Sequence, residues 1–597
     1  MKGFHVDRRF GWDCHGVPVE FEIQKSLDLH GAKAIREFGV AKFNEECRSI
    51  VLRYTEEWRK FVDRSGRWVD FDRQYRTMDI DYMESIWWVV NRLWERGLIY
   101  EGFKCVPYSP GISTPLSNFE ANLNYKSVQD PAVTVRARLD LRKLPNVEIP
   151  LDLPVNAHIW TTTPWTLPSN MAIAVGSEIT YCAVLVPGIE IAVVAKSRAA
   201  ELFSEPEIID EFLGAKLIGT EYKQFFSYFE EERASNAFRI YPGDSFVTDQ
   251  DGTGLVHMAS FGEDDLTVFL ANNIKVVDPV DEDGRFDSTV ADFQGLNIKQ
   301  ADPKIIADLK QRGLLVSHKT IEHNYPFCWR TDTPLIYKSI SSWFVKVEAI
   351  KDLLLHSNSQ INWVPAHLKE GRFGNWLEGA RDWAISRNRF WGTPIPIWKC
   401  TSCEHFHCIG SVAELEQKTS TKISDLHSHF IDELSFACEK CAAPTKRISQ
   451  VLDCWFESGS MPYAQAHYPF ENKEQFEANF PADFIAEGLD QTRGWFYTLL
   501  VLSSALFGRP AFKNVVVNGI LLAEDGRKMS KSLKNYPPPD EVMNKHGADA
   551  LRLYMLASPA TRAEELRFSE DGVKQVVRQA ILPLWNSYNF FSYLRTS

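Results

Sequence analysis

The chain has 597 residues, of which 44% are apolar and 24% charged, and its formal net charge is −13 at pH 7. This length predicts several domains, roughly three to five, with room for large cores. The acidic balance argues against a protein that coats nucleic acid without sequence preference. A few well-placed Lys or Arg side chains can still form a local phosphate-binding groove.

Targeting signals and membrane segments are not expected. The longest apolar run, residues 497–507, is too short to span a bilayer, and the N-terminus lacks the pattern of a signal peptide. Eleven cysteines, four of them in two Cys-x-x-Cys pairs, favour a reduced setting with a metal site over a disulfide framework. We therefore expect a cytoplasmic protein with no membrane partner.

The order of the predicted elements indicates an α/β fold with an insertion. Residues 1–130 read as mixed α/β, with helices predicted over 43–62 and 82–93 and a helix stop at Gly97. Residues 131–340 are rich in short β-type runs separated by Pro, Gly and Asp, which predicts an inserted β-rich domain. The expected strands of this domain are 133–139, 171–175, 181–186, 191–194 and 274–277.

The α/β pattern returns over residues 341–540 and is interrupted at 399–448 by the cysteine pairs. Residues 541–597 are predicted to be a connecting segment followed by a helix that Pro583 kinks. One face of this helix is apolar and carries Val573, Val576, Val577, Ala580, Ile581 and Leu584.

The loop Lys528-Met529-Ser530-Lys531-Ser532 is the first candidate for catalysis. It follows a strand-like run over 515–522 and the turn Glu524-Asp525-Gly526. Two lysines three residues apart on a loop can stabilise negative charge on a polyphosphate. A solvated basic loop is the alternative for so short a motif.

A second candidate is the glycine-bearing turn at 487–495, which joins a predicted strand to the apolar helix 496–507. Such a turn at the carboxyl edge of a sheet is where α/β folds bind nucleotides. Asp490 and Gln491 can reach ribose hydroxyls, and Glu487 can reach an amino group. The alternative is that Asp490 only caps the helix.

The cysteines Cys400, Cys403, Cys438 and Cys441 have the ligand spacing of a tetrahedral zinc knuckle. Four thiolates leave no position for water, so the zinc is expected to be structural. Reduced, buried cysteines are the alternative. Substitution of one ligand by His405, His407 or Cys408 is less consistent with the spacing.

For two further clusters of residues, the residue types alone do not decide between a functional and a purely structural role. Gly11-Trp12-Asp13-Cys14-His15-Gly16 places an indole beside a carboxylate, which can form a pocket for an ammonium group or a simple tight turn. The threonines at 161–163, with Asn170, His257 and the acidic segment after Phe261, can orient a hydrolytic water. Threonines in a strand are usually only strand residues.

Taken together, these segments resemble class I aminoacyl-tRNA synthetases and, within that class, the isoleucyl-tRNA synthetase family. The resemblance runs through nearly the whole chain and rests on five motifs in family order. They are Gly-Trp-Asp-Cys-His-Gly at 11–16, Trp-Thr-Thr-Thr-Pro-Trp-Thr at 160–166, Ile-Ser-Arg-Asn-Arg-Phe-Trp-Gly-Thr-Pro at 385–394, Asp-Gln-Thr-Arg-Gly-Trp at 490–495 and the Lys-Met-Ser-Lys-Ser loop.

The resemblance implies a Rossmann-type catalytic domain with an inserted editing domain, a zinc knuckle and the start of a helical anticodon-binding domain. In the synthetic site, isoleucine and ATP with Mg²⁺ give an aminoacyl-adenylate, and the acyl group passes to tRNA(Ile). Asp13 would meet the amino group, and Lys528 and Lys531 would stabilise the leaving pyrophosphate. The adenylate would be held by Glu487, Gly488, Asp490, Gln491 and Trp495.

In the editing site, the resemblance implies hydrolysis of mischarged valine. The matching residues are Thr161, Thr162, Thr163, Asn170, His257 and Asp265. The stretch from His257 to Asp265 is one residue shorter than the usual pattern, which leaves Asp264 and Asp265 as alternatives.

The chain departs from the family by lacking an early His-x-Gly-His signature and most of the anticodon-binding helices. We therefore expect an incomplete form, most simply a monomer, that activates isoleucine poorly and can retain editing. The rival interpretations are an editing-only hydrolase and an inactive zinc-containing RNA-binding paralogue.

Overall fold

The computed structural model describes residues 3, 6–29, 31–116, 118–122, 124–141, 144–147, 153–529 and 534–596. Of the predicted site residues, Lys531 lies outside these ranges. The chain divides into two compact units, which we describe separately. The first unit comprises Met1–Leu29, Ala34–Tyr100 and Trp343–Ser597, and the second comprises His30–Lys33 and Glu101–Ser342.

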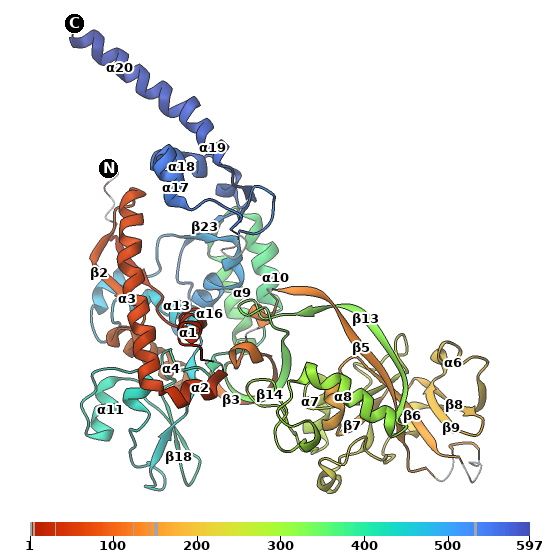
Figure 1. Ribbon diagram of the computed structural model, residues 1–597. Helices are drawn as coiled ribbons and strands as arrows, with labels where there is room; N and C mark the ends of the chain where they lie inside the picture. Colours follow the sequence, from red (N-terminus) through yellow and green to blue (C-terminus); the bar gives the residue numbers. More distant parts are fainter. Residues whose placement is uncertain are drawn as a thin grey trace. The chain divides into compact units, whose positions relative to one another are not determined.

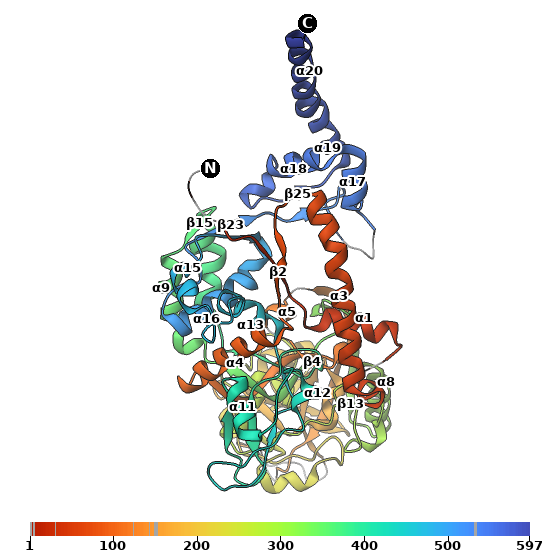
Figure 2. The ribbon, with the colours of Figure 1, turned by 90° about the vertical axis from the view of Figure 1, so that its left-hand side faces the viewer.

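The first unit contains a parallel sheet, two strands of which are connected by a buried apolar helix. Its three strands run in the order β15 (Asn362–Val364), β23 (Asn514–Asn518), β22 (Ile485–Gly488), all parallel. The central strand β23 is labelled in Figure 1, and β15 lies beside it in Figure 2. Helix α16 (Trp495–Phe507) connects β22 to β23 and is buried from Phe496 to Leu506. A helix apolar on all sides belongs inside a protein. It packs between α13 (Cys454–Gly459) and α9 (Lys351–Ser359).

The N-terminal part of this unit pairs β1 (Arg9–Trp12) in parallel with β2 (Asp70–Arg76). Between them run α1 (Val17–Ser26), α2 (Gly31–Phe38) and the long α3 (Val40–Arg64), followed after β2 by α4 (Ile80–Glu95). The two helices predicted here are confirmed, and Gly97 ends the second with a φ of +67°.

The cysteine-bearing segment forms a small module of its own within the first unit. Its antiparallel sheet has the order β19 (Phe406–Cys408), β18 (Ile397–Cys400), β20 (Thr445–Arg447). Helices α11 (Val412–Thr419) and α12 (Ser428–Ile431) lie between β19 and β20 in the chain. Trp398, which is fully buried, packs with Trp87 of α4 and anchors the module.

The C-terminal part is helical, as expected, with α17 (Pro539–His546), α18 (Ala548–Leu556), α19 (Glu570–Val576) and α20 (Leu582–Thr596). A π-helical stretch, Val577–Ile581, lies immediately before α20, of which Pro583 is the second residue; the kink at Pro583 stays a prediction. Of the predicted apolar face, Val573 is fully buried whereas Leu584 is 72% exposed.

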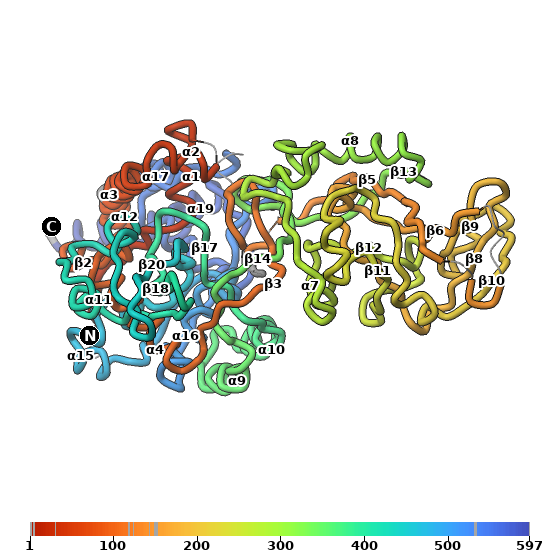
Figure 3. Tube along the Cα trace, turned by 90° about the horizontal axis from the view of Figure 1, so that it is seen from below, coloured from red at the N-terminus to blue at the C-terminus, as the bar shows by residue number. Residues whose placement is uncertain are grey.

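The second unit is β-rich (Figure 3). Its six-stranded sheet has the order β10 (Glu207–Leu213), β8 (Thr180–Val186), β9 (Glu190–Ala195), β6 (Val155–Thr161), β5 (Tyr125–Arg138), β13 (Leu315–Pro326). A second sheet has the order β11 (Arg239–Pro242), β7 (Ala172–Val175), β12 (Leu255–Met258). Helices α7 (Glu263–Ala271) and α8 (Ile298–Gln311) complete the core.

Four of the five strands predicted for this region are confirmed, but the strand predicted at 274–277 is wrong. Residues 274–277 follow α7 as an irregular segment in which Ile274 and Val277 are buried. Their main-chain N–H groups donate to Phe269 O and Ser260 Oγ instead of a β-ladder. The apolar pattern at 274–277 correctly indicated that these side chains are buried. It could not indicate whether their main-chain groups pair with another strand.

Gly519, which follows β23, has no room for a side chain. A Cβ there would lie 1.7 Å from the carbonyl oxygen of Glu564. We predict that Gly519→Ala lowers the free energy of unfolding by about 1–3 kcal/mol, because the backbone must move. Thermal unfolding measures this, with Gly371→Ala as the control since nothing lies within 4 Å of that position. Equal melting temperatures for the two variants would contradict the packing described.

Candidate functional site

Two of the predicted motifs leave the same edge of the parallel sheet. In the pairing of β22 with β23, Glu487 lies opposite Val517 and Gly488 opposite Asn518. Parallel neighbours end at the same edge, so the 487–495 turn and the chain leading to Lys528 both begin there. This is the edge at which open α/β sheets bind ligands.

The 487–495 turn is a short 3₁₀ helix, Leu489–Arg493, between β22 and α16. A Cβ on Gly488 would lie 2.6 Å from Asp490 Oδ1, so glycine allows this carboxylate to fold back over the strand end. The N-cap residue of α16 is Gly494, and not Asp490 as the alternative interpretation supposed; the Trp495 N–H donates to Gln491 Oε1 at 2.9 Å. Glu487 and Asp490 are exposed to solvent, and each accepts one local hydrogen bond, from the Gly488 N–H and from Gln491 Nε2 respectively.

The segment leading to the lysine loop folds back on itself after β24 (Leu521–Leu522). Gly526, with a φ of +80°, makes the turn, and Leu522 pairs with Lys528 in an isolated β-bridge. The Lys528 carbonyl accepts from Asn535 Nδ2 at 3.1 Å, while its side chain is exposed. This holds the backbone of Lys528 and leaves its ammonium group free to move.

Helix α13 links the Asp13 loop to the 487–495 turn. At the start of α13, the Cys454 side chain lies 3.3 Å from the position that a Cβ on Gly16 would take. The next side chain, Trp455, lies 3.1 Å from the position that a Cβ on Gly494 would take. Trp495 Nε1 donates to Ser458 O of this helix at 3.0 Å. The glycines therefore let both loops close on α13.

Asp13 follows β1 and remains accessible to solvent. Desolvation by the surrounding protein, followed by the charge of Glu457, raises the pKa of Asp13 to about 7, against the opposing effect of His15. Such a carboxyl group gains by binding a cation, because an ammonium group compensates the charge that its surroundings disfavour. Perturbed carboxyl groups of this kind cluster at functional sites.

The four predicted zinc ligands come together. The sulfur atoms of Cys400, Cys403, Cys438 and Cys441 all lie within 4.8 Å of one another. Three of their separations are 3.4, 3.4 and 3.7 Å, which fits thiolates about 2.3 Å from a common tetrahedral ion. Main-chain N–H groups of residues 402 and 403 point at Cys400 Sγ and lower its pKa to about 6.

His407 is not in the sulfur cluster itself. Its Nε2 lies 3.4 Å from Cys438 Sγ, where an N–H group would orient a thiolate from outside the ligand set. Among the described residues, the quartet is the group whose geometry suits a metal ion. Its donor set, four soft thiolates, matches zinc.

In the second unit, most of the predicted editing residues form one hydrogen-bonded network. Thr161 Oγ1 and Thr163 Oγ1 are 3.2 Å apart, and the Thr163 hydroxyl is 3.2 Å from that of Thr166. Thr166 Oγ1 lies 2.8 Å from His257 Nε2, and Asn170 Nδ2 lies 3.4 Å from His257 Nδ1. Burial lowers the pKa of His257 to about 4, so this imidazole is neutral at physiological pH.

The structure separates the two candidate carboxylates. Asp264 is exposed, whereas Asp265 is half-buried and its Oδ2 accepts from the Ala259 N–H at 3.1 Å. Ala259 is two residues beyond His257, so Asp265 lies beside the end of β12. Desolvation raises the pKa of Asp265 to about 7. Thr162 is half-buried on the same turn.

Several residues of these sites were not predicted. Thr166 bonds directly to His257, and Tyr222 donates to Asn170 Oδ1 at 2.5 Å. Thr166 is the last residue of the motif at 160–166, so its hydroxyl could have been predicted from the sequence as a member of the site. Tyr222 and Glu457 do not lie in any of the motifs described above, so the sequence around them did not indicate a role in a site. Glu457 contacts His15.

Comparison with known proteins shows the family to which the chain belongs. The family model of class I tRNA synthetases (I, L, M and V) matches residues 1–567. Isoleucine--tRNA ligase of Chlamydia caviae is 57% identical over 99% of this chain and 56% of its own length. The cytoplasmic isoleucine--tRNA ligase of Mus musculus is 53% identical over 99% of the chain and 47% of its own length.

The chain thus spans about half the length of the curated relatives it matches. A solved LeuRS from Agrobacterium radiobacter covers 100% of this chain and 69% of its own, with 17% identity and a TM-score of 0.44, too low to carry an argument. Family matches at this level of identity and coverage are decisive. The chain belongs to the class I tRNA synthetases, and its relatives place it among the isoleucyl enzymes.

Proposed function

We propose that this chain carries the adenylate site and the editing site of an isoleucine--tRNA ligase. The observation that supports this most directly is identity of 53–57% to isoleucine--tRNA ligases across 99% of the chain. Residues 1–130 and 341–540 are assigned to the catalytic domain, 131–340 to the editing domain and 541–597 to the start of the helical anticodon-binding domain. Its partners are isoleucine, ATP with Mg²⁺ and tRNA(Ile).

In the adenylate site, charged side chains of the protein bind groups of opposite charge on the substrates. Asp13 pairs with the ammonium group of isoleucine, and Glu487, Gly488, Asp490 and Gln491 hold the adenylate at the strand ends. Lys528, with Lys531, neutralises the charge that develops on pyrophosphate as it leaves. Trp495, fixed through Ser458, forms one wall of the pocket.

The editing site corrects what the first site cannot distinguish. Excluding valine by one missing methylene group is worth only about 1–3 kcal/mol, a limit for which isoleucine against valine is itself the standard example. Neutral His257 and the threonine hydroxyls orient the attacking water, and Asp265 holds the ammonium group of the mischarged valine.

For the cysteine quartet we propose a structural zinc ion. Four thiolates close its coordination sphere, so its contribution is to hold β18 and β20 together and not to activate water.

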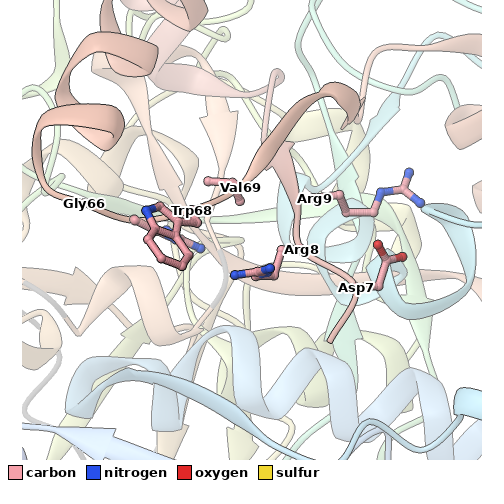
Figure 4. Close-up of a pocket in the computed structure, with 7 residues that line it drawn as sticks. Asp7, Arg8, Arg9, Gly66, Trp68 and Val69 are labelled. Carbon is pink, nitrogen blue, oxygen red and sulfur yellow. The ribbon is translucent and has the colours of Figure 1, made fainter. Parts of the chain in front are cut away.

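For tRNA we propose a contact at a basic hollow of about 440 Å³ at the start of β1. Arg8, Arg67 and Trp68, which is 79% exposed, line it. Figure 4 shows Arg8 extended towards Trp68, with Arg9 directed away. An indole flanked by guanidinium groups suits an unpaired nucleotide, which stacks while its phosphate is neutralised.

Asp13→Asn should weaken binding of a non-hydrolysable isoleucyl-adenylate analogue about 10- to 100-fold, because an ammonium group loses its anionic partner. The pKa of Asp13 is about 7 and the carboxylate is the binding form, so wild-type affinity should rise from about pH 6 to pH 8 and that of the variant should not. Isothermal titration measures both. Asp7→Asn is the control, and equal effects of the two substitutions would exclude Asp13.

Asp265→Ala should lower hydrolysis of valyl-tRNA(Ile) by at least about tenfold, because the substrate ammonium group loses its partner. Deacylation of labelled valyl-tRNA measures it. The exposed neighbour provides a matched control in Asp264→Ala. Unchanged hydrolysis in Asp265→Ala, or loss in both variants, would move the site elsewhere.

Cys403→Ser should reduce bound zinc from about one equivalent and lower the melting temperature, since a serine hydroxyl is a poor zinc ligand. Elemental analysis of the purified protein gives the zinc content. Cys408→Ser, in the same module but outside the quartet, should retain zinc. Full zinc content in Cys403→Ser would disprove the ligand set.

Trp68→Ala should weaken tRNA(Ile) binding about 5- to 100-fold through loss of base stacking. Arg67→Ala should reduce the salt dependence of binding by about one phosphate contact. Filter binding at several salt concentrations measures both. Trp58→Ala, which removes another exposed indole of the same unit, is the control, and an equal loss there would contradict a specific contact.

A further inference from the structure

Next to the Asp13 loop lies a row of four ionisable side chains, three of them buried, that the proposed function does not use. Asp425 Oδ1 is 2.5 Å from His427 Nδ1, and His427 Nε2 is 2.9 Å from His15 Nε2. His15 Nδ1 is 2.6 Å from Glu457 Oε2. The side chains of His15, His427 and Glu457 are at most 1% exposed, so the two contacts of His15 are shielded from water, whereas the Asp425 side chain is 17% exposed.

The row has more contacts than two neutral histidines have protons. Each of the three contacts needs one proton between its two atoms, and a neutral imidazole has only one N–H group. With both carboxylates ionised and both imidazoles neutral, one contact would bring two unprotonated atoms together without water, which is costly. The row must therefore hold one additional proton.

The surroundings determine where this proton lies. Although burial opposes it, hydrogen bonding from His427 and the charge of Arg48, whose Nη2 is 2.6 Å from Asp425 Oδ2, keep the pKa of Asp425 below its ordinary value. Burial lowers the pKa of His427 to about 4. His427 is therefore neutral, donates from Nδ1 to Asp425, and can only accept at Nε2.

The direction of the other bonds follows. His15 must donate from Nε2 to His427, and the additional proton is shared between His15 Nδ1 and Glu457 Oε2. Glu457 is fixed in turn, because its Oε1 accepts from the Thr393 N–H at 2.9 Å. Trp391 stacks on His427 with ring centroids 4.4 Å apart and donates from Nε1 to Cys14 O.

The row ends at the amino-acid pocket. The main chain of His15 hydrogen-bonds to the Asp13 carboxyl group, and the charges of His15 and Glu457 act on Asp13 in opposite directions. Asp425 and His427 lie between the two cysteine pairs in the sequence, so the cysteine module contributes directly to the support of this pocket.

We propose that Asp425 and His427 are positioning residues for the proposed isoleucine pocket. By accepting the Nε2 proton of His15, His427 keeps that nitrogen protonated, and the row thereby fixes the His15 ring, its main chain and the Asp13 carboxylate. This inference rests on the proposed adenylate site for its consequence, but the protonation of His15 does not depend on any ligand.

The decisive variants differ only in whether an acceptor remains at the Nε2 position. His427→Leu removes it, whereas the Oε1 of His427→Gln can replace it. In histidine-labelled protein, the ¹⁵N shift of His15 Nε2, assigned with His15→Gln, should report a protonated nitrogen in the wild type and in His427→Gln. It should report an unprotonated nitrogen in His427→Leu.

Affinity for the isoleucyl-adenylate analogue should follow the same pattern. It should fall about 10- to 100-fold in His427→Leu, since a misplaced carboxylate binds its partner poorly, and less in His427→Gln. His429→Leu is the matched control, because His429 contacts Asn44 and Glu45 and not His15.

An unprotonated Nε2 in the wild type, or a His15 signal and affinity unchanged in His427→Leu, would overturn the proposal. Failure of the unsubstituted chain to bind the analogue would instead count against the proposed adenylate site, and the ¹⁵N measurement would still decide the state of His15.

Discussion

The parallel pairing of β22 with β23 is the constraint on which the rest of the first unit depends. It brings the carboxyl ends of two strands, separated in the chain by the buried helix α16, to one sheet edge. The 487–495 turn and the lysine-bearing segment can act on one ligand only because they start from adjacent strands. Gly519 permits the backbone of Glu564 to approach, and Gly488 and Gly494 leave room for the side chains of Asp490, Gln491 and Trp455.

Both sites prepare a carboxylate in the same way. Asp13 and Asp265 lie in different units, yet desolvation raises the pKa of each to about 7. A carboxylate whose protein surroundings disfavour its charge gains more from an ammonium group than a fully hydrated carboxylate does, because the cation compensates that charge. In the proposed function, one amino acid is recognised twice by the same physical means, first for activation and then for hydrolysis.

What could be predicted from the sequence was local. The cysteine spacing predicted a quartet whose sulfur atoms do meet, and periodicity predicted α3, α4 and α16. Contacts between distant segments carried no such signal: His15 and His427 are 412 residues apart. Residues 274–277 have the apolar pattern of a strand because they are buried, but they pair with no neighbouring strand. A hydrophobic pattern does not reveal where main-chain N–H groups donate.

A crystal structure of the chain with a non-hydrolysable isoleucyl-adenylate analogue tests the central claim most directly. The account predicts the analogue across the carboxyl ends of β22 and β23, with its ammonium group on Asp13 and its ribose at Asp490 and Gln491. An analogue bound away from that edge, or contacting only one of the two strands, would contradict it.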